Sequence, residues 1–221
     1  MMDPITDALA AQAPAASLLA AYALLFALAE IEIEGPHGWA EKLPTWFRVT
    51  PWYARAFRLA SGGKPLTGYH ATMIPLAFTS FHLGLAFGLV WTPALEASIL
   101  GRFAIWVVVW DLLWFLLNPH FGWRRFRAGE VWWLSRIWIA RIPLEYWCGL
   151  AVSFGLAAAA LHWDPEAPAI VEHAAFATLL LAICPLGAAL APWYQRWHRH
   201  MRREGADERR HVFDKDVLDK E

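Results

Sequence analysis

The chain has 221 residues, of which 58% are hydrophobic and only 18% are charged, and its mean hydropathy is +0.33. This composition is too apolar for an ordinary soluble domain, and a net charge of −1 gives no general attraction to nucleic acid. The 15 tryptophans support a membrane protein, since Trp combines an apolar body with a polar N–H suited to the headgroup layer. We therefore expect an all-α integral membrane protein that contacts membrane lipids and binds no nucleic acid.

Five apolar stretches have the length that a helix needs to cross the hydrocarbon core. They cover about residues 15–34, 69–91, 98–118, 144–163 and 170–193. Proline and glycine mark several of their ends, because proline cannot continue a helix and disfavours helix in the residue before it. The first stretch stops at Gly35, the third at Pro119 and the fifth at Pro192, while Pro75 and Pro185 are expected to kink the second and fifth. No basic region precedes the first stretch, so we expect it to be retained as a helix.

The distribution of basic residues predicts the orientation. All of the 19 Lys and Arg residues except Arg102 lie between the first and second stretches, between the third and fourth, or after the fifth. Because cytoplasmic loops retain Lys and Arg, we expect these three segments in the cytoplasm and the amino terminus outside, in the cell inner membrane. An odd number of crossings fits this alternation. Residues 194–221 are expected to form a charged cytoplasmic tail after the membrane domain, residues 1–193. Its first, basic residues are expected to continue the fifth helix, and the rest to be solvated and partly disordered.

The two long basic loops each contain an amphipathic stretch rich in Trp. These stretches are PTWFRVTPWYARAFRLA, residues 44–60, and EVWWLSRIWIARIP, residues 130–143. We expect both to lie on the inner headgroup layer as interfacial helices or turns. Their simplest role is anchoring, through inserted Trp and attraction of Arg to anionic lipid, and the alternative is a platform that binds an anionic lipid headgroup.

Ionisable groups at membrane depth are costly, so each one needs a partner or a purpose. With the predicted orientation, several of them fall in or beside the cytoplasmic half of the bundle. They are Glu30, Glu32, Glu34, His70, Asp111, His120 and Glu145, together with the polar Asn118. Helical spacing puts Glu30 and Glu34 on one face and turns Glu32 elsewhere. Asp111 and Asn118, seven residues apart, likewise share one side of the third helix.

Carboxylates from different helices combined with imidazole form the ligand set that holds divalent metals inside helical bundles. The preferred hypothesis is a metal-dependent enzyme acting on a lipid-like substrate at the cytoplasmic surface. Its residues are assigned as metal ligands Glu30, Glu34, His70 and Asp111; general acid or base Glu145 or His120; and substrate-binding residues Asn118, Arg124 and Arg141. None of the strongly specific motifs for metal, phosphate or nucleophilic chemistry is present, so the sequence does not name the reaction.

Three alternatives remain open from the sequence. The carboxylates can pair with loop arginines such as Arg124 or Arg141 and only hold the bundle together. An ion- or proton-coupled transporter or channel subunit would use Asp111 as its titrating group, with Pro75 and Pro185 marking broken helices. A non-catalytic subunit of a larger membrane complex, or a homo-oligomer, would use its tryptophans as packing surface.

Haem is not expected. His82 is placed near the middle of the second stretch, but a bis-histidine haem needs a second histidine at similar depth, and the others lie near the ends or in the tail. We expect His82 instead to hydrogen-bond a neighbouring hydroxyl or backbone carbonyl.

Overall fold

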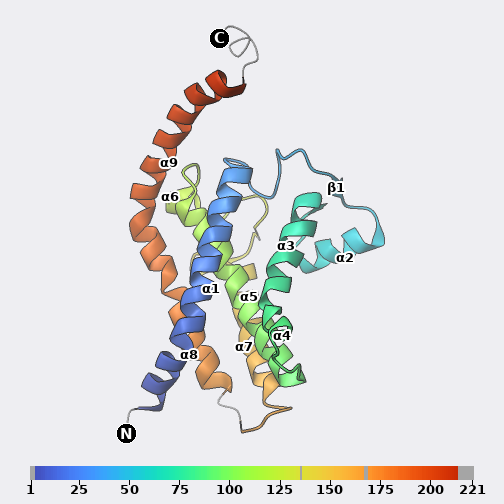
Figure 1. The fold of residues 1–221 in the computed structure, drawn as a ribbon. Helices are drawn as coiled ribbons and strands as arrows, with labels where there is room; N and C mark the ends of the chain where they lie inside the picture. Colours follow the sequence, from blue (N-terminus) through green and yellow to red (C-terminus); the bar gives the residue numbers. More distant parts are fainter. Residues whose placement is uncertain (1–2, 135, 167–168, 214–221) are drawn as a thin grey trace.

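The computed structural model describes residues 3–134, 136–166 and 169–213, and its fold is all-α (Figure 1). The helices are α1 (Pro4–Glu34), α2 (Trp52–Ala60), α3 (Gly68–Phe81), α4 (Leu83–Ala86), α5 (Pro93–Leu117), α6 (Gly122–Arg125), α7 (Leu144–Ala160), α8 (Ala169–Leu181) and α9 (Ile183–Phe213). Two short antiparallel ribbons join β1 (Phe47–Arg48) to β2 (Leu66–Thr67) and β3 (Trp138–Ile139) to β4 (Ile142–Pro143).

Helix α5 is the centre of the bundle and contacts α1, α7, α8 and α9 (Figure 1). Its Trp106 is fully buried, donates a hydrogen bond from Nε1 to the Leu19 carbonyl at 2.9 Å, and stacks on Tyr22. Helix α1 presents a buried stripe of small residues to its neighbours: Ala16, Ala20, Ala23 and Ala27. Because these positions are three or four apart they share one face, and their small side chains let neighbouring helices approach closely.

Three helical segments in the described residues are long and apolar enough to cross a membrane, which makes the chain a helical membrane protein. They are Pro4–Glu34, Pro93–Leu117 and the nearly continuous Ala169–Gly205. Helix α7 is apolar but has 17 residues, so it extends only about 26 Å, and α3 with 14 residues extends about 21 Å. The number of crossings, expected to be five, therefore stays a prediction.

Two helices begin well before the expected residue. Helix α1 starts at Pro4 and not near residue 15, and α5 starts at Pro93 and not near residue 98. In both, proline occupies the first helical turn, where its missing N–H is tolerated and its fixed φ favours the helix. Thr92 also caps α5 by accepting a hydrogen bond from the Leu95 backbone N–H at 3.1 Å.

The second expected stretch is interrupted. Helix α3 ends at Phe81, and only the single turn of α4 follows before an extended segment leads to Pro93. His82 at the break lies 2.9 Å from the Phe78 carbonyl through Nδ1 and 3.2 Å from Glu96 through Nε2. The expected hydrogen bond to a backbone carbonyl is confirmed. Because Glu96 lies in the first turn of α5, His82 lies beside the start of that helix, and its depth in the bilayer stays a prediction.

The fifth expected stretch is broken at Ala182 and then continues far past its expected end. Helix α8 stops at Leu181, four residues before Pro185, whose ring would clash with the carbonyl at that position in a continuous helix. Pro192, in contrast, lies inside α9. The expected end of the fifth stretch at Pro192 was therefore wrong. The expected continuation of the helix into the tail is confirmed, since α9 runs to Phe213. Residues 214–221 of the expected tail lie outside the described residues.

The two amphipathic stretches take different forms. The first contains β1 and then α2, whose Trp52 is 81% exposed, and α2 lies crosswise to the bundle helices (Figure 1). The second stretch ends in the β3–β4 hairpin, whose loop residues Ala140 and Arg141 both have positive φ (51° and 67°). This pair is the pattern of a two-residue hairpin turn of the primed type. Ser135 of this stretch is not among the described residues.

Trp106→Ala is expected to destabilise the fold, since it leaves a cavity where the indole ring of α5 packs against α1. The loss should be about 3–5 kcal/mol, visible as a lower melting temperature in detergent. Trp193→Ala is the matched control, because Trp193 is 62% exposed and should change the melting temperature little. Equal effects of the two variants would contradict the packing described here.

Candidate metal centre

A buried group of two carboxylates and one imidazole lies where α1 ends and α3 begins. Glu30 and Glu34 are in the last turns of α1, and His70 is in the first turn of α3. One ligand atom from each lies within 4.8 Å of the others, and the three residues are 9%, 6% and 5% exposed. Two carboxylates and one imidazole at this spacing are a set of donors that can hold a divalent metal ion.

The imidazole of His70 is oriented by its own helix cap. Thr67, fully buried, accepts a hydrogen bond from the His70 backbone N–H at 3.2 Å, and its Oγ1 lies 2.8 Å from His70 Nδ1. The Trp39 ring stacks on the imidazole ring of His70, with ring centroids 3.9 Å apart and an interplanar angle of 16°. When Nδ1–H donates to Thr67, Nε2 carries the lone pair, which is the tautomer that a metal requires.

The turn after α1 has an unusual backbone that serves this group. Trp39 and Ala40 both have φ near 55°, a conformation that non-glycine residues rarely adopt. In it, the Ala40 N–H donates to Glu34 Oε1 at 2.5 Å, and Trp39 Nε1 donates to the Pro65 carbonyl at 2.9 Å. The turn therefore fixes one oxygen of Glu34 and ties the end of α1 to the segment leading into α3.

Glu30 lies between two further donors. The Tyr69 hydroxyl and Trp110 Nε1 are close enough to act on its carboxylate, although neither meets full hydrogen-bond geometry with any acceptor among the described residues. Trp110 is 6% exposed. Donors that face a carboxylate offset part of the cost of burying its charged form.

Asp111 lies beside the group and outside it. Its Oδ2 accepts a hydrogen bond from the Tyr146 hydroxyl at 2.5 Å, and it acts electrostatically on Glu30 and Glu34. The structure thus brings together three of the four expected ligands and holds the fourth against α7.

Several carboxyl groups crowd together at this end of the bundle. Glu30, Glu34 and Asp111 act on one another electrostatically, and Lys64 supplies positive charge to Asp111 while lying 4.5 Å over the Trp39 ring. A bound divalent cation would offset the repulsion between their charged forms. A metal ion is therefore a natural partner for the group, since buried charges are paired or bind metal.

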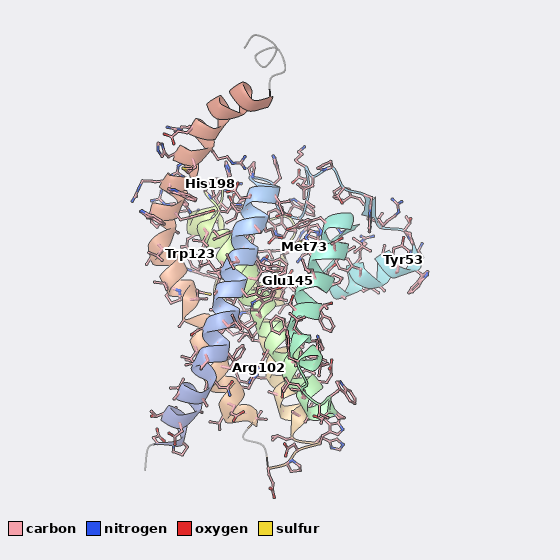
Figure 2. The ribbon with its side chains drawn as sticks, viewed as in Figure 1. Tyr53, Met73, Arg102, Trp123, Glu145 and His198 are labelled. Atoms are coloured by element: carbon pink, nitrogen blue, oxygen red, sulfur yellow. The ribbon has the colours of Figure 1, made fainter. Side chains whose placement is uncertain are left out.

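The two expected acid/base residues lie in different places. Glu145, in the first turn of α7, interacts with Asp111 and Tyr146, and Figure 2 shows it in the middle of the view between α1 and α3. His120 is exposed beyond the end of α5. Partial burial, followed by the charges of His198 and Arg202 on α9, lowers the pKa of His120. The structure places Glu145, and not His120, beside Asp111.

The expected substrate residue Asn118 is fully buried and both ends of its amide are engaged. Its Nδ2 donates to the Gly35 carbonyl at 2.8 Å, and its Oδ1 accepts from the His120 backbone N–H at 2.9 Å. Asn118 thus joins the end of α5 to the end of α1. This amide holds Glu34 in place indirectly, through the chain that follows it.

Arg124 and Arg141 are exposed, and none of the ion pairs within the described residues involves Glu30, Glu34 or Asp111. The alternative in which loop arginines neutralise these acids is therefore not what the described chain shows. Glu32 does point elsewhere, as its spacing predicted: it lies 2.7 Å from His198 Nε2 on α9.

A separate cavity of about 240 Å³ lies on the Arg102 side of the bundle. Figure 2 shows Arg102 in the opposite half of the bundle from His198. Arg102 donates to Gln12 Oε1 at 2.8 Å, and His173 lies 2.8 Å from the fully buried Ser153 hydroxyl. This cavity contains none of the three metal-binding candidates.

Several residues of the site were not anticipated from the sequence. They are Trp39, Ala40, Lys64, Thr67, Tyr69, Trp110 and Tyr146. Thr67 carried a usable signal, since a Thr before an apolar run is a common helix cap. The turn at Trp39 and Ala40 carried none, because neither residue type favours positive φ.

Comparison of the chain with models of known families, with curated proteins and with solved structures finds no match. The site is therefore interpreted from its own geometry.

Asn118→Ala is expected to lower stability by about 1–3 kcal/mol, because it leaves the buried Gly35 carbonyl and the partly buried His120 N–H without their partner. Thermal melting in detergent measures this. Thr178→Ala is the control, since the exposed Thr178 hydroxyl only bonds within its own helix. An unchanged melting temperature for Asn118→Ala would restore Asn118 as a residue available to substrate.

Proposed function

We propose that this chain is a membrane-embedded enzyme that binds a divalent metal ion through Glu30, Glu34 and His70 and acts on a lipid-like substrate at the cytoplasmic membrane surface. The observation that carries the proposal is the buried convergence of these three side chains within 4.8 Å, from two helices joined by a long loop. The oriented imidazole and the crowding of buried carboxyl groups support metal binding over a simple structural role.

The surroundings favour hydrolysis of a polar bond. A divalent metal can polarise an oxygen of the substrate and activate a bound water. Glu145 is the better candidate for general acid or base, because it lies beside Asp111 and Tyr146, whereas His120 lies toward α9. A lipid-like substrate suits the group of Glu30, Glu34 and His70, because this group lies at the end of an apolar bundle. There a polar headgroup can reach the group while the apolar tails stay in the membrane.

We further propose five crossings, with the amino terminus outside and the metal centre in the cytoplasmic half of the cell inner membrane. The placement of basic residues supports this orientation. In this arrangement α3 with α4, and α7, complete the crossings that the three long helices begin.

Ion-coupled transport is the second candidate, favoured by the helix breaks at His82 and Ala182. Flux of Mn²⁺ into proteoliposomes containing the protein distinguishes the two. Transport predicts flux that Asp111→Asn reduces, and the enzyme proposal predicts none.

Metal analysis of the detergent-purified protein tests the proposal directly. After incubation with Mn²⁺ or Zn²⁺ and removal of excess, about one ion per chain is expected in the wild type, because carboxylate and imidazole donors suit both. Glu30→Gln and His70→Ala should each lose it. Thr67→Val should weaken the affinity by about 10–100-fold, since Thr67 only orients the ligand.

Glu32→Gln is the matched control, because Glu32 is on the same helix and faces His198 instead of the group. It should bind metal as the wild type does. A wild-type protein that retains neither ion, or a Glu32→Gln variant that loses metal equally, would overturn the metal centre.

A further inference from the structure

The segment that leads to His70 also carries a shallow, open surface groove with two arginines among its lining residues. The groove, of about 610 Å³, is lined by Arg55, Arg58, Leu59, Gly62 and Gly63. It lies along α2 and the turn that follows it. Trp52 and Leu59 on the same helix are 81% and 87% exposed, so an apolar surface adjoins the two guanidinium groups.

The arginines of the groove have little else to bind. Arg58 Nε donates to the Gly63 carbonyl at 3.3 Å, and neither Arg55 nor Arg58 takes part in an ion pair within the described residues. Guanidinium groups present several fixed donors that match a phosphate. Two such groups beside exposed Trp and Leu side chains complement a molecule with an anionic head and apolar tails.

The opposite face of α2 connects the groove to the metal centre. Phe57 contacts the Trp39 ring at a centroid distance of 6.4 Å, and Trp39 stacks on His70. Gly62, with φ of 72°, lets the turn pass close to α7: a β-carbon on Gly62 would lie 3.5 Å from Glu145 Oε1. Lys64, Pro65 and Thr67 then lead directly into the group around His70.

We infer that the groove between α2 and the Gly62–Gly63 turn binds the phosphate headgroup of an anionic phospholipid, held by Arg55 and Arg58, as the substrate class of the metal centre. That the bound lipid is a substrate rests on the proposed function. That the lipid binds at α2 rests on the groove alone. It moves the headgroup site from Arg124 and Arg141, which lie in the other basic loop, to α2.

Native mass spectrometry of the full chain, titrated with phosphatidylglycerol and separately with phosphatidylcholine, tests this site. The wild type should bind phosphatidylglycerol more tightly. Arg55→Gln/Arg58→Gln should weaken phosphatidylglycerol binding by about tenfold or more, since each basic side chain near anionic headgroups contributes substantially. It should weaken phosphatidylcholine binding much less, because the choline cation of that lipid offsets the charge of its phosphate.

Two controls separate this result from other effects. Arg196→Gln/Arg199→Gln removes the same charge from the exposed side of α9 and should bind phosphatidylglycerol as the wild type does. Mn²⁺ content should be unchanged in the α2 variant, because neither arginine contacts the metal ligands. A protein with no metal but with the α2-specific loss would retain the lipid site and reject the enzyme proposal. Equal losses in both double variants, or none in the α2 variant, would overturn the lipid site.

Discussion

The gathering of acidic side chains at one end of an apolar bundle constrains the rest of this structure. Glu30, Glu34 and Asp111 must keep hydrogen-bond donors or positive charge close to them, because unpaired charge in apolar surroundings is costly. The donors come from every neighbouring segment: a backbone N–H at Ala40, a phenol at Tyr146 and an ammonium at Lys64. The irregular loops at this end are shaped by that requirement as much as by connectivity.

The contrast with the other end of the bundle is informative. There, Arg102 is matched by Gln12 and lies over the Phe176 ring at 4.8 Å, and Ser153 satisfies both His173 and a backbone carbonyl. Each of those polar groups has a hydrogen-bond partner within the bundle. At the acidic end, several carboxyl groups crowd together beside one imidazole, an arrangement that can hold a metal ion.

Much of the architecture could be predicted from the sequence because it depends on local rules. The apolar stretches became helices, and the spacing of the acids correctly put Glu30 with Glu34 and turned Glu32 toward another partner. The convergence of His70 on the two glutamates was anticipated from depth alone. Helix ends were less predictable: Pro4 and Pro93 start helices, Pro192 lies within one, and Pro185 follows a break. The same residue type has opposite effects, depending on whether its missing N–H falls in a first turn or within the helix.

The finer composition of the site depends on tertiary contacts that no local pattern encodes. Asp111 shares its depth with the glutamates, yet Tyr146 on α7 holds it, and that pairing arises only when α5 and α7 pack. Asn118 was expected to face a substrate and instead joins two helix ends. A polar residue at a helix end can serve either purpose, and only the neighbouring chain decides which.

The origin of the three ligands in two separate helices has a thermodynamic consequence. An unfolded chain would not hold the end of α1 near the start of α3, so an ion that binds there binds only the assembled protein. Such an ion acts as a cross-link whose strength grows with its free concentration. The cell's supply of that ion would then govern how long the protein persists after insertion, as well as whether its centre is filled.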